Sequence, residues 1–365
     1  INTPMDISIR LRGDRQSPSY IRRMDVIKGE ASPLRQINAN MWVLDCPFTV
    51  LSANFLPASL FNIVNRKNNA RIARWIVEQA TALGFKNYIH LIDTDIYRSR
   101  YLKEYIHPAV SIYYRRDYII GEAYWRRHGT RLEPELAASA DIVLANSTRF
   151  AAELQPYNPH TYPIETGVNL ELYNPAKKYE TPGDMQDIPR PIIGYMGTIN
   201  STRLDGELLY QIISQRPDYS FVFTGPEDDI FRRNRIHSLK NAYFTGQKKV
   251  DELPAYIAAY DVCINPQMVN EITDGNYPLK IDEYLAMGKP TVATSTHTMR
   301  NIFAGHTHLA INPEEWLAAI DRAVTEADDK ELAKQRIAFA ETHSWGHSVK
   351  KIYDIIDKFL KERTT

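Results

Sequence analysis

The sequence predicts an α/β protein of two domains, each built on a parallel sheet, and three observations support this fold class. The chain has 365 residues, which is more than one hydrophobic core usually serves. Its second half alternates short apolar strands with segments of helical spacing, as βαβ units do. The strands end in Gly, Pro or a small polar residue, and open α/β sheets bind ligands at this carboxyl edge.

The second half contains five predicted strands with predicted helices between them. We expect strands at 191–197, 219–225, 242–246, 261–266 and 290–294. Helices are expected at 204–214 and 252–259, and a third helix begins near Pro278 and ends at Gly288.

The first half has a weaker pattern of the same kind. Apolar runs predict strands at 42–45, 88–92, 110–114 and 141–147, and helical spacing predicts helices at 70–83 and 133–139. Between the halves, residues 174–189 are rich in Pro, Lys, Asp and Gly without an apolar period, which predicts a linker. A last helix at about 348–361 has one apolar face, so we expect that face to pack.

Composition and charge exclude several classes of protein. The 44 basic residues balance the 44 acidic ones, which argues against nucleic acid as a partner. Cys46 and Cys263 lie in apolar runs and are expected to be buried thiols of a reducing compartment. No apolar run is long enough to span a membrane and no signal peptide is evident, so we expect a cytoplasmic protein. The chain begins at Ile1 without methionine, so native residues and targeting information before it are expected to be missing.

The N-terminal stretch is locally basic. Six cationic side chains fall within its first 28 residues: Arg10, Arg12, Arg15, Arg22, Arg23 and Lys28. They form either a solvated segment or a surface for anionic lipid, which would give peripheral contact with the inner membrane surface.

The helix that begins near Pro278 is the strongest candidate for a binding site. A helix N-terminus offers unpaired N–H groups and a positive dipole end, which favour phosphate. Lys280 adds a cation in the first turn, and Glu283 lies three positions later on the same face, where its carboxylate could accept hydrogen bonds from ribose hydroxyls. Phosphate donors beside a ribose acceptor predict a nucleotide site, and two solvated surface residues are the alternative.

A set of motifs in fixed order resembles one family over most of the second half. The motifs are Pro-Ile-Ile-Gly-Tyr-x-Gly at 191–197, Thr-Gly-Pro at 224–226, Gly246 before Leu-Pro-x-Tyr at 253–256, Asp-Val at 261–262, Asn270 with Thr273, and Pro-Leu-Lys-x-x-Glu-Tyr-Leu-Ala-x-Gly-Lys-Pro at 278–290. The first half adds weaker matches at 140–147 and 167–169, and Trp345 precedes the last helix. The chain thus resembles the GT-B retaining glycosyltransferases of "group 1" (glycosyltransferase family 4-like), which build bacterial surface polysaccharides.

The resemblance implies the architecture in more detail. It implies two facing Rossmann-like, doubly wound domains with a cleft between them and a C-terminal helix that crosses back to the first domain. The N-terminal acceptor domain would comprise residues 1–180 with the crossover helix 348–365, and the nucleotide-sugar donor domain would comprise residues 181–347.

The resemblance also implies roles for individual residues in donor binding. Gly197 and Thr198 would let the backbone approach the donor phosphates, since glycine has no Cβ to clash. Arg203 and Lys280 would neutralise the diphosphate leaving group in place of a metal ion, and Glu283 would bind the ribose. The remaining donor-binding candidates would line the base pocket, touch the donor sugar or flank Lys280: Thr224, Gly225, Gly246, Val250, Asn270, Thr273 and Leu279.

The sequence departs from the family pattern at two points. Family members often carry a second glutamate eight residues before the one matched by Glu283, where this chain has Gly275, with Asp274 and Glu271 nearby. The family also places a histidine after the strand expected at 110–114. This chain has none there, so Arg116 and Asp117 become the catalytic candidates, with His128 and the distant His90 as weaker alternatives.

The implied activity is transfer of a sugar from a nucleotide-sugar donor to a saccharide or lipid-linked saccharide acceptor. The enzyme would be a hexosyl- or glycosyltransferase (EC 2.4 type) of polysaccharide or glycan biosynthesis, retaining, with no cofactor and no metal. Two alternatives stay open: a nucleotide-sugar epimerase of GT-B fold, and a non-catalytic nucleotide-sugar-binding module. The donor nucleotide and sugar, the acceptor, the linkage and the oligomeric state do not follow from the sequence.

Overall fold

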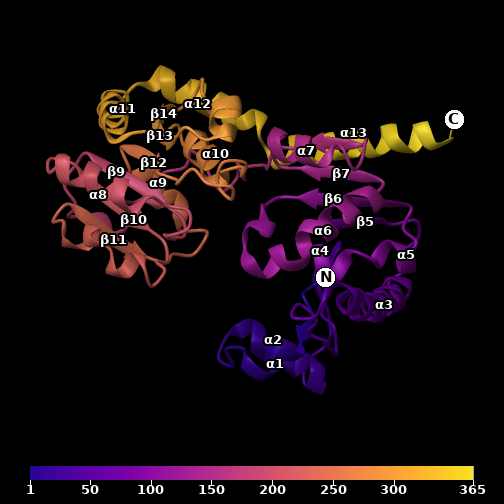
Figure 1. The fold of residues 1–365 in the computed structure, drawn as a ribbon. Helices are drawn as coiled ribbons and strands as arrows, with labels where there is room; N and C mark the ends of the chain where they lie inside the picture. Colours follow the sequence, from indigo (N-terminus) through magenta and orange to yellow (C-terminus); the bar gives the residue numbers. More distant parts are fainter. Residues whose placement is uncertain (365) are drawn as a thin grey trace. The chain divides into compact units, whose positions relative to one another are not determined.

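The structure is a computed structural model that describes residues 1–364, and these form two compact units. The N-terminal unit consists of Ile1–Tyr114, Ile119–Val143 and Leu154–His160. The C-terminal unit contains Arg115–Tyr118, Leu144–Glu153 and the described residues from Thr161 onward. Each unit is described by itself below, with the elements labelled as in Figure 1.

The first half of the chain contains short strands and helices of very unequal length. Its elements are β1 (Met5–Asp6), α1 (Ile7–Arg12), α2 (Pro18–Lys28), β2 (Leu34–Asn38), β3 (Met41–Leu44), β4 (Thr49–Val50), α3 (Ala58–Ala82), β5 (Ile89–Asp93), α4 (Ile96–Ser99), α5 (Leu102–Ile106), β6 (Val110–Arg115), η1 (Ile119–Gly121), α6 (Ala123–Ser139), β7 (Ile142–Ala145), α7 (Thr148–Leu154) and β8 (Thr161–Pro163).

The main sheet of this half has four strands in the order β5-β6-β7-β8, with β5 and β6 parallel. The strand predicted at 42–45 lies outside it, because β3 pairs antiparallel with β2 in a separate hairpin. The boundary between the two units passes through the four-stranded sheet, since β6 and β7 hold residues of both.

The second half of the chain alternates strands and helices at nearly regular spacing. Its elements are η2 (Gly183–Met185), β9 (Ile192–Met196), α8 (Gly206–Gln215), β10 (Ser220–Thr224), η3 (Phe231–Arg233), η4 (Arg235–Ser238), β11 (Ala242–Gly246), α9 (Leu253–Ala259), β12 (Val262–Asn265), α10 (Leu279–Ala286), β13 (Thr291–Thr294), the π-helix η5 (Met299–Phe303), β14 (His308–Ala310), α11 (Pro313–Thr325), α12 (Lys330–Thr342) and α13 (Trp345–Thr364). All five strands and the three helices predicted in this half are present.

The C-terminal sheet is parallel throughout, with the strand order β11-β10-β9-β12-β13-β14. Numbered along the chain from β9, this order is 3-2-1-4-5-6, that of the Rossmann fold. The chain reverses its direction across the sheet between β9 and β12. Ligands of such sheets bind outside the carboxyl ends of the two strands at this switch point.

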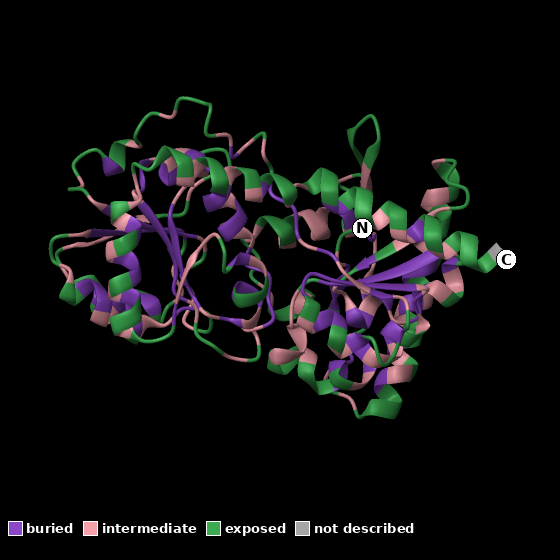
Figure 2. Cartoon of the chain, turned by 90° about the horizontal axis from the view of Figure 1, so that it is seen from above, coloured by how far each residue is buried: buried purple, intermediate pink, exposed green. Residues whose placement is uncertain are grey.

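Two hydrophobic layers cover the two faces of this sheet. One contains side chains of α8 and α11, including Leu209 and Trp316, and the other contains side chains of α9 and α10, including Ile257 and Tyr284. The four inner strands β10, β9, β12 and β13 are therefore buried (purple in Figure 2), whereas the outer strands β11 and β14 are partly exposed. A parallel sheet with helices on both faces needs continuous apolar strands, which is why the sequence signal is strong here.

The segment predicted as a linker packs against the C-terminal core instead. Met185 is 1% exposed, and the Asp184 carboxylate accepts hydrogen bonds from Lys248 (2.6 Å) and Tyr256 (2.8 Å). The linker prediction is wrong in this respect, because single apolar side chains anchor an irregular segment without a periodic pattern.

The last helix is confirmed, but its apolar face is only partly covered. Ile356 is buried, whereas Val349 and Tyr353 are exposed. The first turns of α13 are held by hydrogen bonds from Ser348 and Lys351 to Glu165 within the same unit.

Candidate functional site

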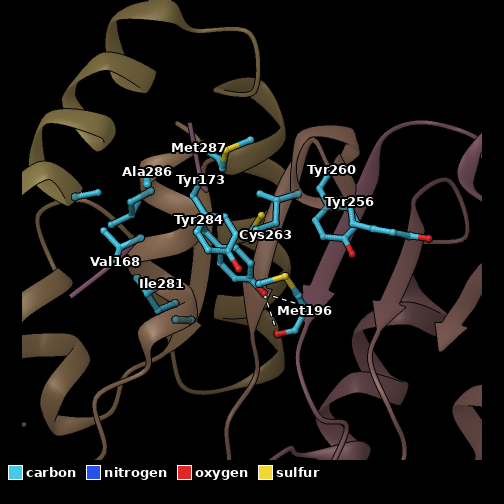
Figure 3. Close-up of a cluster of buried hydrophobic side chains, with 14 of the residues drawn as sticks. Val168, Tyr173, Met196, Tyr256, Tyr260, Cys263, Ile281, Tyr284, Ala286 and Met287 are labelled. Carbon is cyan, nitrogen blue, oxygen red and sulfur yellow. Dashed lines mark hydrogen bonds between the residues drawn. The ribbon is translucent and has the colours of Figure 1, made fainter. Parts of the chain in front are cut away.

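The helix α10 is held at the switch point by one tyrosine. The Tyr284 hydroxyl accepts a hydrogen bond from the backbone N–H of Met196 (2.8 Å), the last residue of β9. Figure 3 shows this bond inside the buried cluster, together with a longer bond that the Tyr284 hydroxyl donates to the Met196 carbonyl (3.5 Å). Because Tyr284 is completely buried, the start of α10 is fixed against the carboxyl end of β9.

Lys280 is directed to this strand end. Its Nζ donates to the Tyr195 hydroxyl (2.6 Å) and lies 4.0 Å from the centre of the Tyr195 ring. Tyr195 in turn donates to the carbonyl of Thr198 (3.0 Å), so its hydroxyl oxygen is free to accept from the amine. Burial lowers the pKa of Lys280 to about 7, against the opposing effect of the Glu283 carboxylate. An anion placed here would favour the charged amine.

Two glycines make room beside Lys280. Gly197 and Gly225 follow β9 and β10 with φ of 132° and 149°, where L side chains are rarely found. A Cβ on Gly197 would lie 2.8 Å from Lys280 Nζ, and a Cβ on Gly225 would lie 2.0 Å from the Gly197 carbonyl oxygen. The three residues are thus brought together, and a ligand can approach the backbone closely.

Glu283 is half-buried one turn further along α10. Burial raises its pKa to about 7, while a hydrogen bond with Tyr173 and the charge of Lys280 act in the opposite direction. Tyr173 is 3% exposed and was not singled out from the sequence, because nothing in its neighbourhood marks a tyrosine 110 positions earlier as a partner of α10.

Asn265 is a second polar residue that sequence reasoning missed. It ends β12, the other strand of the switch point, and is 1% exposed. Since side chains alternate along a strand, it faces the α10 side together with Cys263. Within residues 1–364 neither its Oδ1 nor its Nδ2 has a hydrogen-bond partner. Buried amides are normally paired, so this amide is available to a ligand. The sequence signal that could have identified Asn265 is a polar residue at the end of an apolar strand.

Arg203, Asn270 and Thr273 lie in two loops that hydrogen bond to each other. Asn270 donates to the carbonyl of Thr202 (3.1 Å), and the Arg203 carbonyl accepts from Met268 N–H (2.8 Å). Thr273 is fully buried and donates to the Met268 carbonyl. The side chains of Asn270 and Thr273 therefore fix the loop, while the Arg203 guanidinium is exposed.

The catalytic candidates belong to the segment Arg115–Tyr118 of the same unit. The Asp117 carboxylate accepts from Asn276 Nδ2 (3.3 Å) and lies 3.8 Å from the Arg203 guanidinium. Arg116 is exposed, and its carbonyl accepts from Asn146. The structure thus brings Asp117 to the loop that follows β12.

The missing glutamate of the family pattern has a steric explanation. A Cβ on Gly275 would lie 2.4 Å from the Phe150 ring, so no side chain fits at this position. The adjacent Asp274 is engaged by the N–H of His297 (2.8 Å) and by Arg149 (2.6 Å). Neither position presents a free carboxylate.

The candidates for the base pocket are more dispersed. The Thr224 hydroxyl is buried between the hydroxyls of Tyr260 (2.6 Å) and Thr245 (2.8 Å), so it supports the strand ends from within. Gly246 ends β11 with φ 71°, and Val250 is 66% exposed. Leu279, the first residue of α10, is half-buried beside Lys280.

A buried polar network lies on the opposite side of α10. Asp282 is completely buried, and its carboxylate accepts from Tyr277 and lies 2.9 Å from His343 Nδ1. Burial raises the pKa of Asp282, and both neighbours oppose this shift. The network joins α10, the helix that carries Lys280, to His343, the residue directly after α12.

Residues 1–364 contain neither a metal-binding cluster nor a membrane-spanning helix. No three His, Cys, Asp or Glu side chains within this range are grouped so that they could hold a metal ion. No helix within it combines the length and apolar character needed to cross a bilayer. Cys46 and Cys263 are buried free thiols, as expected.

The fold and the position of this site define a class of protein. The structure resembles Anabaena Alr3699/HepE solved with UDP (14% identity, 87% of this chain and 86% of that one, TM-score 0.64). It also resembles sucrose-phosphate synthase from Thermosynechococcus elongatus (17% identity, 94% and 93%, TM-score 0.65). The chain has the GT-B fold, which confirms the predicted fold class.

The sequence comparison agrees with the motifs over part of the chain. Residues 190–326 match the family described as "Glycosyl transferases group 1", the family that the motifs of this segment resemble. A curated relative is the "Putative teichuronic acid biosynthesis glycosyltransferase TuaH" of Bacillus subtilis (strain 168), 27% identical over 188 residues. That match covers 50% of this chain and 47% of the relative, so the chain spans about half of the relative's length.

Proposed function

We propose that this protein transfers a sugar from a nucleotide-sugar donor to a saccharide or lipid-linked saccharide acceptor in polysaccharide biosynthesis. The observation that carries the proposal is the position of Lys280, whose amine lies beside Gly197 at the switch point of a Rossmann-type sheet. The solved relatives include complexes of HepE with UDP and with UDP-glucose. These complexes support a UDP-sugar as the first donor to test.

In the proposed mechanism, cations of the protein stabilise the departing nucleoside diphosphate. Lys280 and Arg203 would neutralise its developing charge, as preorganised charges do in other transferases. Because Gly197 and Gly225 have no Cβ, the phosphates could come close enough to accept hydrogen bonds from backbone N–H groups around Thr198. No metal and no cofactor is needed in this scheme, and transfer would proceed with retention.

The ribose and the sugar would be held on the two sides of the diphosphate. The Glu283 carboxylate would accept hydrogen bonds from the ribose hydroxyls, with Tyr173 orienting it. Asn265 supplies an unpaired amide at the end of β12. Asp117 and Arg116 would face the reacting sugar, while Asn270 and Thr273 would shape its pocket through the loop they stabilise.

The proposal keeps the domain roles implied by the family. Residues 1–180 with helix 348–365 would bind the acceptor, and residues 181–347 would bind the donor. Closure of the two would exclude water and limit hydrolysis of the donor. Work at the cytoplasmic face of the inner membrane, with peripheral contact, would suit a lipid-linked acceptor.

The test is donor turnover by the full chain. Purified protein is incubated with UDP-, GDP-, ADP- and dTDP-sugars, with and without saccharide acceptors, and nucleoside diphosphate release is measured. We expect acceptor-dependent release from one donor. Lys280→Ala should weaken nucleoside diphosphate binding by roughly 1.5–3 kcal/mol, the range for a hydrogen bond to a charged group, whereas the exposed Lys334→Ala should not change it.

Other outcomes would point to the two alternatives. Epimerisation of the donor sugar without diphosphate release would indicate a GT-B epimerase. Thermal stabilisation without any turnover would indicate a binding module, and a ligand at a hundred times its Kd should stabilise the protein by about 2.7 kcal/mol. Unchanged diphosphate affinity in Lys280→Ala would remove Lys280 from the site.

A further inference from the structure

The N-terminal unit contains a cavity that none of the donor-binding or catalytic candidates lines. It has a volume of about 570 Å³ and lies among α1, residues 50–55, α3, α4 and the start of α6. Every lining residue belongs to the N-terminal unit. Cavities of roughly 300–1,000 Å³ are the size that small ligands occupy, so the cavity fits a small molecule or one end of a longer one.

One wall of the cavity is a single face of α3. Phe61, Asn65, Asn68 and Ile72 line it, at the spacing that places side chains on one side of a helix. The apolar side chains of Leu11 and Phe55 also line the cavity, although they are 68% and 67% exposed. Such exposed apolar groups around a hollow favour a ligand with a hydrocarbon part.

The charge of the lining favours an anion. Arg12, Arg98 and Arg127 line the cavity, and Asp6 is the one acidic residue among the lining residues, all of which are described. Arg98 also pairs with Asp95 outside the lining (3.3 Å), and Arg127 donates to the Phe55 carbonyl (2.7 Å). The three guanidinium groups still outnumber these two carboxylates. Asp6 Oδ1 already accepts hydrogen bonds from the Ser8 hydroxyl (2.6 Å), the Ile9 N–H (2.8 Å) and the Ser52 hydroxyl (2.9 Å). A guanidinium group pairs well with phosphate oxygens, because its N–H donors match their geometry.

Two lining side chains hold polar atoms without a partner in the described structure. Asn65 is 5% exposed, and its Nδ2 has no hydrogen-bond acceptor within residues 1–364. Asn54 is half-buried, and its Oδ1 has no donor there. Buried amide groups are normally paired. A donor and an acceptor left open on the wall of one cavity are groups that a polar ligand would satisfy.

We propose that this cavity binds an anionic amphiphile, a hydrocarbon chain that ends in a phosphate group. The hydrocarbon contacts Leu11, Phe55 and the α3 face, and the phosphate contacts the arginines and Asn65 Nδ2. The identification of this molecule as the acceptor rests on the proposed function, whereas the binding site itself does not.

The first experiment measures binding by calorimetry to the full chain without any donor. The probes are decyl phosphate below its micelle concentration, decanol and inorganic phosphate. We expect decyl phosphate to bind about tenfold more tightly, or better, than either other probe. Equal binding of inorganic phosphate would mean a plain anion site, and equal binding of decanol would mean that the arginines play no part. Either result overturns the proposal.

Variants locate the site. Arg98→Gln and Asn65→Leu should each weaken decyl phosphate binding by about tenfold. Arg100→Gln is the matched control, because Arg100 does not line the cavity and pairs with Glu135 (3.2 Å). Arg12→Gln and its control Arg10→Gln repeat the comparison on the exposed helix α1, where neither change is expected to impair folding. Unchanged affinity in Arg98→Gln and Arg12→Gln would contradict the assignment.

The two proposals fail in distinguishable ways. Lys280→Ala should bind decyl phosphate as the unchanged protein does while losing affinity for nucleoside diphosphates. Decyl phosphate binding without sugar transfer would refute the transferase but keep the cavity, and transfer without such binding would refute the cavity alone.

Discussion

The two units of this protein differ in how their binding features relate to their cores. In the C-terminal unit, Lys280 and Glu283 stand on a helix whose other side chains, such as Tyr284, are buried in one large cluster. In the N-terminal unit the apolar residues form several smaller clusters, and the cavity lies among short segments. A site built on a core is positioned rigidly, whereas a cavity lined by short segments can adapt to its ligand. This contrast fits the proposals made above, in which the C-terminal unit binds a nucleotide and the N-terminal cavity binds an amphiphile.

The largest expected effect tests the difference between the cores. Trp316→Ala should destabilise the C-terminal unit by roughly 3–5 kcal/mol, because Trp316 is fully buried between α11 and the sheet. Trp42→Ala is the matched change in the N-terminal hairpin, where Trp42 is half-buried against Phe85, and should cost about 1 kcal/mol. Urea unfolding followed by circular dichroism measures both. An equal loss of unfolding free energy in the two variants would contradict the difference between the two cores.

The second prediction concerns the tight packing at Gly275. Gly275→Ala should lower the stability by about 1–3 kcal/mol, the usual cost of overpacking, because its Cβ would collide with Phe150. Gly183→Ala serves as the control, since a Cβ there meets no atom within 4 Å. Thermal unfolding of the two variants should separate them clearly. A neutral Gly275→Ala would reopen the question of a missing carboxylate.

The third prediction is the pH dependence of donor binding. Lys280 has a pKa of about 7 in the unliganded site, which is lowered by burial, and a bound diphosphate raises it. Above pH 7 the amine must therefore take up a proton on binding, so the Kd of the nucleoside diphosphate should rise by up to about tenfold per pH unit. Below pH 7 the amine is already charged and this contribution vanishes.

Calorimetry between pH 7.5 and 9.5 in buffers of different ionisation enthalpy would detect that proton. Lys280→Met is the control and should bind weakly with a flat profile over this range. A flat profile in the unchanged protein would mean that Lys280 stays charged in the empty site.

The fourth prediction is a smaller effect on ribose recognition. Tyr173→Phe removes the hydroxyl that bonds to Glu283 and should weaken nucleoside and nucleotide binding alike by about 0.5–1.5 kcal/mol. Tyr179→Phe, a nearby tyrosine whose hydroxyl bonds to the backbone of its own loop, is the control. A loss confined to the sugar-bearing donor would place Glu283 near the sugar instead.

The last prediction is the absence of an effect. EDTA should leave sugar transfer intact, because in the proposed mechanism Lys280 and Arg203 of the C-terminal unit would neutralise the diphosphate in place of a metal. In the N-terminal unit, Asp93 and Asp95 have the spacing of a metal-binding Asp-x-Asp motif. Asp95 caps α4 instead, because its carboxylate accepts a hydrogen bond from the Arg98 N–H. Activity lost on chelation and restored by manganese would require a different mechanism.

The sequence by itself determined the C-terminal sheet and the candidate helix. The inner strands β9 and β10 are mostly apolar and are followed by the markers Gly197 and Gly225, because strands covered on both faces bury their side chains. The helix from Leu279 to Ala286 follows from local signals, namely Pro278 before it and Gly288 after it. The family's motifs fall on these same segments.

Only the tertiary structure decided which distant residues join them. Tyr195, Tyr173 and Asn265 come to α10 from other elements, and no local pattern links them to it. The packing of Met185 and the cavity along α3 are equally invisible in the sequence. The physical reason is that a helix or strand is specified by periodicity over a few neighbours, whereas a polar contact or a cavity depends on single side chains brought together by the whole chain.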